Sequence, residues 1–134
     1  MYYGDNGLRA NDSEIGALTG LTLARVTVDT DRSEILFYSE CGRMFIMVHD
    51  QDCCETVTID DICGDITDIV GSPIVKAMES TSIGSNPLRG SETWTFYKID
   101  TIKGGVTIRW YGTSNGYYSE SASFYEVIGG GNIH

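Results

Sequence analysis

The predicted fold class depends on one stretch, Ile59-Asp-Asp-Ile-Cys-Gly-Asp-Ile-Thr-Asp-Ile-Val70. Its apolar positions 59, 62, 66, 69 and 70 recur at helical spacing, and Asp60 and Asp61 stand where acidic side chains favour the positive end of a helix. Gly71 and Pro73 then supply a stop signal. The stretch therefore predicts an amphipathic helix that packs its isoleucine stripe on a sheet and turns its aspartates to water.

Three strand-like runs precede this expected helix. Leu21 to Val28, Glu34 to Ser39 and Arg43 to His49 are rich in β-branched or aromatic residues, and short polar segments separate them. This pattern predicts a three-stranded antiparallel meander.

The chain after the expected helix predicts a second meander. A strand at about Pro73 to Met78 comes first, and the expected strands of the meander are then Glu92 to Ile99, Gly105 to Tyr111 and Tyr117 to Ile128. Glu79 to Gly90 collects Ser, Gly, Asn and Pro and is expected to be an exposed loop. Asn115-Gly116 is a strong hairpin signal, because both central residues of a type I′ turn need positive φ.

These elements predict an α+β fold, with two antiparallel β-meanders and one amphipathic helix packed on the sheet. The chain has 134 residues, which is a common length for one domain with one core. Its polar and glycine-rich ends predict a flexible tail over residues 1–16, a single α+β domain over 17–128, and a flexible glycine-rich tail over 129–134.

The charge of the chain restricts its partners. The formal net charge is −10, whereas affinity for nucleic acid and for anionic membranes depends on clustered Lys and Arg. We therefore expect neither as a partner. Seven acidic residues and no Lys or Arg lie between Asp50 and Asp68. This stretch is either a solvated surface, a contact for a basic partner, or a mimic of DNA.

The sequence predicts a cytoplasmic protein. It contains no run of about 18 apolar residues, which a transmembrane helix requires. Its N-terminus, Met-Tyr-Tyr-Gly-Asp, lacks the basic start and apolar run of a signal peptide. Cys41, Cys53, Cys54 and Cys63 are accordingly expected to be reduced thiols.

Catalytic patterns are missing from the sequence. The two histidines are His49 and His134, and the latter ends the glycine-rich tail. A Ser/His or Cys/His device would depend on His49 alone, and no phosphate-binding or dinucleotide-binding glycine motif occurs. We therefore expect a protein that is not an enzyme and needs no cofactor.

The segment His49-Asp-Gln-Asp-Cys-Cys-Glu55 carries residue types that can bind metal. The adjacent Cys53 and Cys54 do not have the C-x2-C spacing of a zinc knuckle, and no second pair follows. The segment is more simply a turn with one buried cysteine and acids that are solvated or cap the next element. A strained vicinal disulfide is an alternative. No metal site is predicted.

Alternation in the later strands places an arginine among tyrosines. The expected core-facing residues are Trp94, Phe96, Val106, Ile108 and Trp110. If Asn115-Gly116 is a two-residue loop, Arg109 pairs with Ala122 across the strands. Both side chains then lie on the face of the sheet that is turned away from the core. The residues expected around Arg109 are Tyr111, Tyr118 and Glu120.

Arg109 has two interpretations. It either pairs with Glu120, or it holds a phosphate with its planar fork while tyrosines stack on a ring. Arg25, between Ala24 and Val26 in the first strand, is a second candidate for an anion, because it points away from its apolar neighbours.

Four segments of the chain, in order, resemble a family of short phage and prophage proteins. They are Gln51-Asp-Cys-Cys-Glu55, Ile69-Val-Gly-Ser-Pro-Ile74, Thr93-Trp-Thr-Phe-Tyr-Lys98, and Val106 to Glu120 with its Ser-Asn-Gly-Tyr-Tyr-Ser block. The resemblance spans residues 20 to 127. The Cys-Cys-Glu and Ser-Asn-Gly-Tyr-Tyr-Ser blocks also look like those of the Thoeris anti-defence sponge family, phage proteins that sequester cyclic ADP-ribose signals.

The second resemblance implies a non-enzymatic homo-oligomer with ligand sites between subunits. By this resemblance the ligand-binding residues would be Arg109, Asn115, Tyr117 and Tyr118, and Cys53, Cys54 and Glu55 would shape a neighbouring turn. Arg25 joins the ligand-binding set on the residue argument alone.

The leading hypothesis is a non-enzymatic phage-type anti-defence protein in the cytoplasm of an infected bacterial host. It would bind and sequester a small nucleotide-derived immune signal that resembles cyclic ADP-ribose. One alternative is an acidic inhibitor that covers a host defence or nucleic-acid-binding protein with the 50–68 surface. Another alternative is a structural component of a phage.

Overall fold

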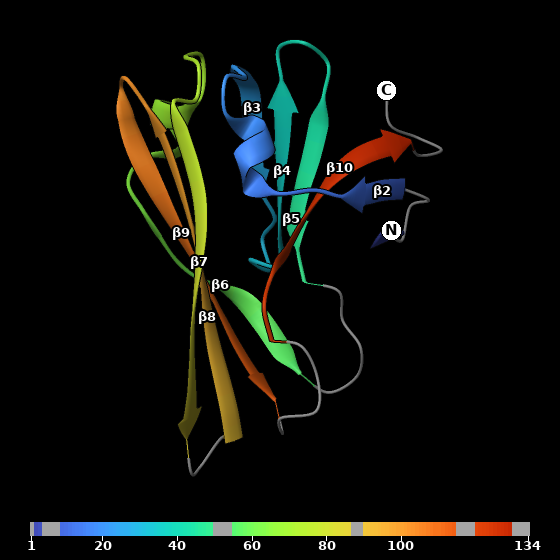
Figure 1. Cartoon of the computed structure of the whole chain (residues 1–134), viewed down its shortest axis with the longest axis vertical. Helices are drawn as coiled ribbons and strands as arrows, with labels where there is room; N and C mark the ends of the chain where they lie inside the picture. Colours follow the sequence, from blue (N-terminus) through green and yellow to red (C-terminus); the bar gives the residue numbers. More distant parts are fainter. Residues whose placement is uncertain (1, 4–8, 50–54, 87–89, 115–119, 130–134) are drawn as a thin grey trace.

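The chain forms two antiparallel β-sheets that pack face to face (Figure 1). The computed structural model describes residues 2–3, 9–49, 55–86, 90–114 and 120–129. The first sheet has the order β1-β2-β10-β5-β4-β3, and the second sheet has the order β6-β9-β8-β7. The strands of the first sheet are β1 (Tyr2–Tyr3), β2 (Arg9–Asp12), β3 (Leu23–Val28), β4 (Glu34–Ser39), β5 (Met44–Val48) and β10 (Ser123–Gly129). Those of the second sheet are β6 (Thr56–Cys63), β7 (Lys76–Asn86), β8 (Gly90–Thr101) and β9 (Gly104–Ser114).

The α+β prediction is wrong, because the described residues contain no α-helix. Their only helices are two 3₁₀ helices, η1 (Ile15–Leu18) and η2 (Ile66–Ile69). Neither is long and apolar enough to cross a membrane. The fold is a β-sandwich.

The expected amphipathic helix over 59–70 is instead strand β6 followed by η2. A bulge at Asp60 shifts the register of β6 against β9, so that Ile59 pairs with Trp110 and Ile62 pairs with Ile108. Ile59 and Ile62 therefore both turn toward the core although they are three residues apart. The bulge and the following 3₁₀ turn thus imitate the spacing of a helix.

The first meander is confirmed. Strand β4 pairs with β3 on one side and with β5 on the other, both antiparallel. Strand β2 lies within residues 1–16 and pairs with β10.

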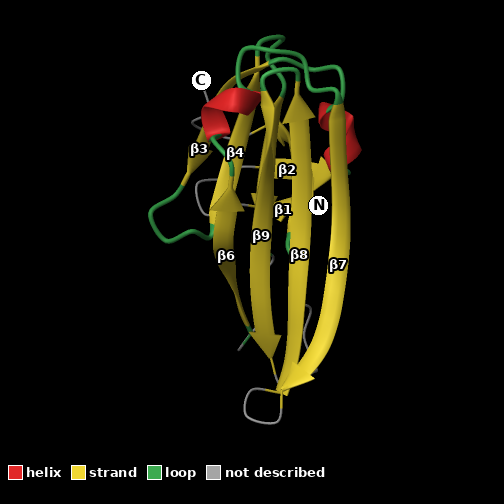
Figure 2. Ribbon diagram, turned by 90° about the vertical axis from the view of Figure 1, so that its left-hand side faces the viewer, coloured by secondary structure: helices red, strands yellow, loops and turns green. Residues whose placement is uncertain are grey.

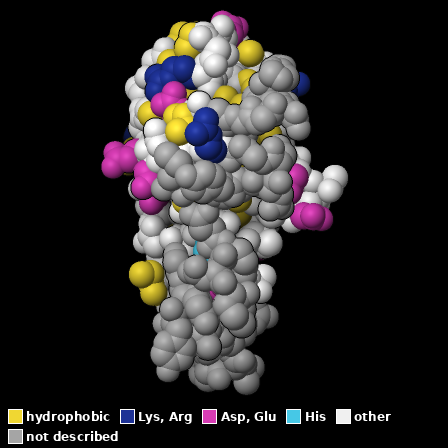
Figure 3. Space-filling view, turned by 90° about the vertical axis from the view of Figure 1, so that its right-hand side faces the viewer, with side chains coloured by type: hydrophobic (Ala, Val, Ile, Leu, Met, Phe, Trp, Pro, Cys, Tyr) yellow, Lys and Arg dark blue, Asp and Glu magenta, His cyan; other side chains and the backbone are white. Residues whose placement is uncertain are grey.

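The outer side of the first sheet carries basic and acidic side chains close together (Figure 3).

The second meander exists, but with different strands. The loop expected over 79–90 is wrong, because Lys76–Asn86 forms β7 and pairs with β8 along its whole length. Pairing with β8 satisfies the backbone hydrogen-bonding groups on one side of this segment. Its residues are small and polar, but the segment lies at the edge of the sheet, where side-chain packing matters least.

The expected hairpin between β9 and the last strand is also wrong. Strand β9 lies between β6 and β8, whereas β10 belongs to the first sheet and pairs with β5 and β2. Phe124 of β10 stacks on Phe45 with ring centroids 5.4 Å apart, which places β10 over the core. Asn115 and Gly116, the expected turn, lie outside the described residues.

The core lies between the two sheets. Its largest side chains are Trp110, Tyr97, Phe37 and Phe45, each with no exposed surface. Trp110 Nε1 donates to Met47 Sδ at 3.2 Å, and this contact joins the two sheets. The prediction for Trp110 is therefore confirmed.

Trp94 and Phe96 were expected in this core, and that expectation is wrong. In the observed register Thr95 pairs with Trp110, so Thr95, Tyr97 and Ile99 face inward. Trp94 and Phe96 point to the opposite side and are partly exposed. Both phases of this strand contain large apolar residues, so alternation alone does not decide between them.

Candidate ligand-binding site

The outer face of the second sheet, turned away from the first sheet, is a broad surface that no described segment crosses in its middle (Figure 2). At its centre Phe96 of β8 pairs directly with Arg109 of β9, and Trp94 pairs with Tyr111. These four side chains point to one face, because alternate residues of paired strands share a side. We call them the aromatic–arginine platform.

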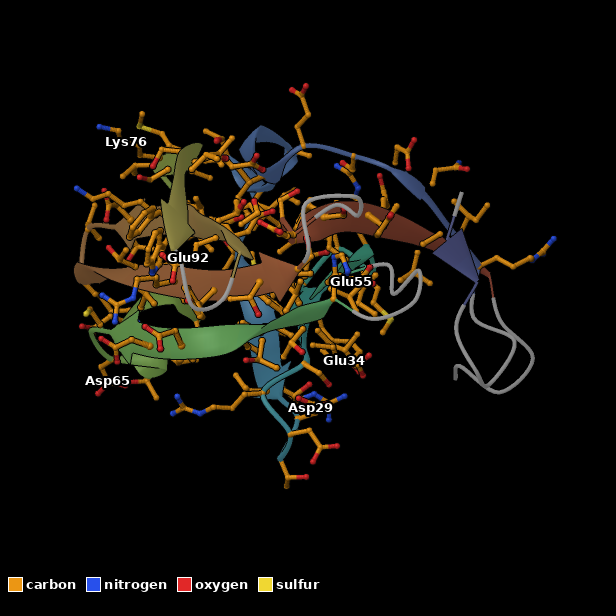
Figure 4. All side chains as sticks on the ribbon, turned by 90° about the horizontal axis from the view of Figure 1, so that it is seen from below. Asp29, Glu34, Glu55, Asp65, Lys76 and Glu92 are labelled. Carbon is orange, nitrogen blue, oxygen red and sulfur yellow. The ribbon has the colours of Figure 1, made fainter. Side chains whose placement is uncertain are left out.

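The aromatic part of the platform is held in a tilted arrangement. The rings of Trp94 and Tyr111 have centroids 5.1 Å apart and an interplanar angle of 45°. Tyr111 Oη donates to Glu92 Oε1 at 2.7 Å, which fixes the phenol ring. Glu92, labelled in Figure 4, belongs to β8. On the neighbouring strand, a Cβ added to Gly84 would lie 3.7 Å from the Trp94 ring. Because Gly84 has no side chain, only the backbone of β7 faces the Trp94 ring at this position.

The arginine of the platform is paired with a carboxylate. Arg109 Nε donates to Asp60 Oδ2 at 2.7 Å, and a second guanidinium nitrogen lies 2.5 Å from the same oxygen. The bulge at position 60 brings this carboxylate into reach. Both side chains are about two-fifths exposed (41% and 42%), so the pair stabilises the fold by only about 0–1 kcal/mol.

A second aspartate lies next to Arg109 across the strands. Asp61 pairs in register with Arg109, and Cys63 Sγ donates to Asp61 Oδ2 at 3.2 Å. This hydrogen bond, with a smaller effect from the charge of Arg109, lowers the pKa of Asp61. Asp61 therefore stays ionised at neutral pH and adds negative charge beside the arginine.

The structure places the predicted ligand-binding residues Arg109 and Arg25 in different sheets. Arg109 shares its face with Tyr111, as expected, but its carboxylate partner is Asp60 rather than Glu120. Arg25 lies in the first sheet, where its Cζ sits 4.2 Å from the centroid of the Tyr38 ring. Asn115, Tyr117, Tyr118, Cys53 and Cys54 lie outside the described residues.

Glu55 is a buried structural residue. His49 Nδ1 lies 2.8 Å from the carbonyl oxygen of Ser121, which can only accept, so Nδ1 carries a hydrogen. His49 Nε2 lies 2.8 Å from Glu55 Oε2, within hydrogen-bond distance. The side chains are 4% and 0% exposed. This pair ties the end of β5 to the start of β6 and to the segment before β10.

Glu120 is likewise inside the sandwich. Its carboxylate accepts hydrogen bonds from the hydroxyls of Ser91 at 3.0 Å and Thr93 at 2.9 Å, and also from Ser114. Three hydroxyl donors compensate the burial of this charge. Glu120 therefore faces away from Arg109, on the other side of the sheet.

Sequence reasoning missed Trp94, Phe96, Asp60 and Glu92 as members of the outer face. One signal was present: Tyr97, Ile99 and Thr101 continue the phase of Thr95 toward the end of the strand, and that phase is the buried one. Within the described ranges, no group of three or more His, Cys, Asp or Glu side chains is arranged to hold a metal ion.

Comparison with known proteins gives one match. Residues 17–124 match the family described as "Domain of unknown function (DUF7448)". No curated protein and no solved structure matches the chain.

Proposed function

This chain belongs to the DUF7448 family, a domain of unknown function, and we propose that it is a non-enzymatic protein that binds a small nucleotide-derived molecule on the aromatic–arginine platform. The observation that carries the proposal is the register of β8 and β9. It places Arg109 directly beside Phe96, and Trp94 beside Tyr111, on a face that no described segment covers in its middle.

Each half of a nucleotide has a counterpart on this face. A base is a flat ring that stacks on aromatic side chains, and such stacking stabilises a complex by about 1–3 kcal/mol per base. A phosphate is recognised by the planar fork of an arginine through paired hydrogen bonds. Trp94 and Phe96 would supply the ring contacts, and Arg109 would supply the phosphate contact.

Binding requires that Arg109 leave Asp60. Because this ion pair is exposed and weak, a phosphate can replace the carboxylate at small cost. The negative charges of Asp60 and Asp61 oppose an anion, so the stacking contacts must contribute most of the affinity. The proposal therefore favours a ligand with at least one accessible ring over a bare phosphate.

The resemblance to phage sponge proteins makes the proposal more specific. We propose that the ligand is a cyclic ADP-ribose-like immune signal, and that the protein acts for a phage by sequestering it in the cytoplasm of an infected bacterium. Sequestration needs tight, stoichiometric binding and no chemical step. The platform supports this role, because it offers stacking and one cation.

A thermal-shift screen with recovery of the ligand tests the proposal. The purified protein is heated with cyclic ADP-ribose isomers, cyclic dinucleotides, cyclic trinucleotides and NAD. A ligand at a hundred times its dissociation constant raises the stability of the native state by about 2.7 kcal/mol, which shifts the melting temperature measurably. The expected result is a shift with ligand recovered unchanged. Conversion of the ligand would contradict the non-enzymatic role, and no shift with any compound would contradict nucleotide binding.

A further inference from the structure

We propose that the free edge of strand β7 binds an extended, positively charged peptide segment of a partner protein, which adds to the second sheet as a fifth strand. This proposal is independent of the nucleotide site, because it uses the edge and inner side of β7 rather than the outer face.

Strand β7 is the last strand of the second sheet and has 11 residues. One side of its backbone pairs with β8 over the full length. Among the described residues, no backbone hydrogen bond reaches its other side between Ala77 and Gly84. Natural proteins usually protect such edges with proline, lysine, bulges or a covering segment. Strand β7 carries Lys76 at its first position and the inward-facing Glu79, and η1 lies beside its start, but no proline or register shift interrupts its pairing.

Among the described residues, the first sheet does not cover the inner side of β7 from Glu79 to Ile83. The register pairs Glu79, Thr81 and Ile83 with the inward-facing Tyr97, Thr95 and Thr93, so all three β7 side chains turn toward the first sheet. They are nevertheless exposed, and Ile83 is 76% exposed. Within the described part of the chain, these three positions therefore have no facing layer.

Two adjoining grooves occupy this position. The larger one, of about 670 Å³, lies between Ala77–Glu79 of β7 and two segments of the other layer, Asp12–Gly16 and Ala122–Tyr125. The smaller one, of about 320 Å³, continues along Thr81 and Ile83. Glu79 lines both. Together they run beside the free edge, as a peptide strand hydrogen-bonded to β7 would.

The acidic lining of the grooves indicates a positively charged partner. Their described lining contains the carboxylates of Asp12, Glu14, Glu79 and Glu120 and no Lys or Arg. In strand addition the backbone supplies affinity, and alternate side chains of the peptide supply specificity. Lysine or arginine at alternate positions of the peptide would approach Glu79, and apolar residues between them would contact Met78, which is 50% exposed on the outer side.

A second copy of this chain fits the edge less well. It would bring together two chains of net charge −10, each with acidic side chains along this edge. A basic strand from another protein meets no such repulsion.

The test uses a fluorescein-labelled hexapeptide of alternating lysine and valine, with a glutamate–valine peptide of the same length as control. Binding is followed by anisotropy at low and high salt, and backbone hydrogen exchange is followed along β7. The lysine peptide is expected to bind, to slow exchange between Ala77 and Gly84, and to weaken with salt. The glutamate peptide is expected not to bind.

Two charge reversals locate the contact. Glu79→Lys is expected to weaken binding of the lysine peptide about fivefold at low salt, the effect of losing one exposed ion pair. Glu40→Lys, in the turn after β4, makes the same change in net charge outside the grooves and is expected to leave binding unchanged. Both variants should retain the circular dichroism spectrum and the nucleotide response of the wild type.

Three results would overturn the proposal. One is equal binding of the lysine peptide to Glu79→Lys and wild type, and another is exchange protection outside β7. The third is concentration-dependent protection of β7 without peptide together with a dimeric mass, which would assign the edge to a second copy. A lost nucleotide response with intact peptide binding would instead contradict only the nucleotide site.

Discussion

Arg109 lies directly opposite Phe96 across strands β9 and β8, and its guanidinium forms an ion pair with Asp60 of β6. The guanidinium therefore lies beside aromatic side chains on the outer face and is paired with a partly exposed carboxylate. Arg109 is accordingly available to an anionic ligand, and the Asp60 carboxylate competes with that ligand.

Removal of the competitor should strengthen nucleotide binding. In Asp60→Asn the ligand phosphate no longer displaces a carboxylate from Arg109, so the dissociation constant should fall about two- to fivefold, as expected for an exposed ion pair. Titration of the variant by calorimetry measures the change. Asp31→Asn, an equal charge change in an exposed turn of the first sheet, should have a much smaller effect. Equal gains in both variants would show that net charge alone is responsible.

Trp94 should report binding by its fluorescence. The chain has two tryptophans, and Trp110 is fully buried, so a ligand stacked on the platform should quench only Trp94. In Trp94→Phe the remaining emission should not change on addition of ligand. Quenching that persists in Trp94→Phe would place the ligand elsewhere.

Thr95→Val should stabilise the protein. Thr95 has no exposed surface, and its hydroxyl is the only buried side-chain oxygen or nitrogen in the described part of the chain without a hydrogen-bond partner. Removing an unsatisfied buried hydroxyl should raise the free energy of unfolding by about 1 kcal/mol. Urea unfolding of Thr95→Val measures this change.

Thr93→Val is the matched control for this prediction. The Thr93 hydroxyl donates to the buried carboxylate of Glu120, so its loss should lower the free energy of unfolding by about 1–2 kcal/mol. Opposite signs of the change in unfolding free energy for Thr93→Val and Thr95→Val would support the assignment of a hydrogen-bond partner to Thr93 but not to Thr95. Changes of the same sign would contradict it.

The Arg43–Glu126 pair should make part of the stability depend on acid pH. Arg43 donates two hydrogen bonds of 2.8 Å to Glu126, and these lower the pKa of that carboxyl from its ordinary 4.5. A lowered pKa in the folded state stabilises the protein above pH 4.5, and this stability is lost as the pH falls through the lowered value. Because both side chains are partly exposed, the effect should not exceed about 1 kcal/mol.

Comparison of melting temperatures at pH 7 and pH 3 measures this effect. Arg43→Met should lower the melting temperature at pH 7 and have a smaller effect at pH 3, because the contribution of the ion pair is lost as the pH falls through the lowered pKa of Glu126. The same difference between variant and wild type at both pH values would show that Arg43 acts through packing on Phe45, whose ring centroid lies 5.2 Å from Arg43 Cζ.

Local patterns in the sequence predicted the first meander, because its strands are adjacent in the chain and are separated by short polar turns. They failed at β6, where one bulged residue at Asp60 gives two strand isoleucines the spacing of a helix. They also failed at β10. This strand follows β9 in the chain but pairs with β5 and β2 of the first sheet instead. That choice depends on packing of Phe124 against distant residues, which a local pattern does not contain.

The candidate site was predicted in part for the same reason. Arg109 and Tyr111 share one face because they are two residues apart in one strand, and alternation fixes that relationship. Their neighbours depend on which strands pair. The sequence pointed to Tyr118 and Glu120 from the last strand, whereas pairing with β8 and β6 supplies Trp94, Phe96 and Asp60.

Calorimetric titration with cyclic ADP-ribose of the wild type, Arg109→Ala and Arg25→Ala tests the central claim most directly. Arg25 is the matched control, since it also lies against an aromatic ring but in the first sheet. The account predicts that Arg109→Ala abolishes binding with a melting temperature within a few degrees of the wild type, while Arg25→Ala binds normally. Normal binding by Arg109→Ala would contradict the platform, and loss of binding only in Arg25→Ala would move the site to the first sheet.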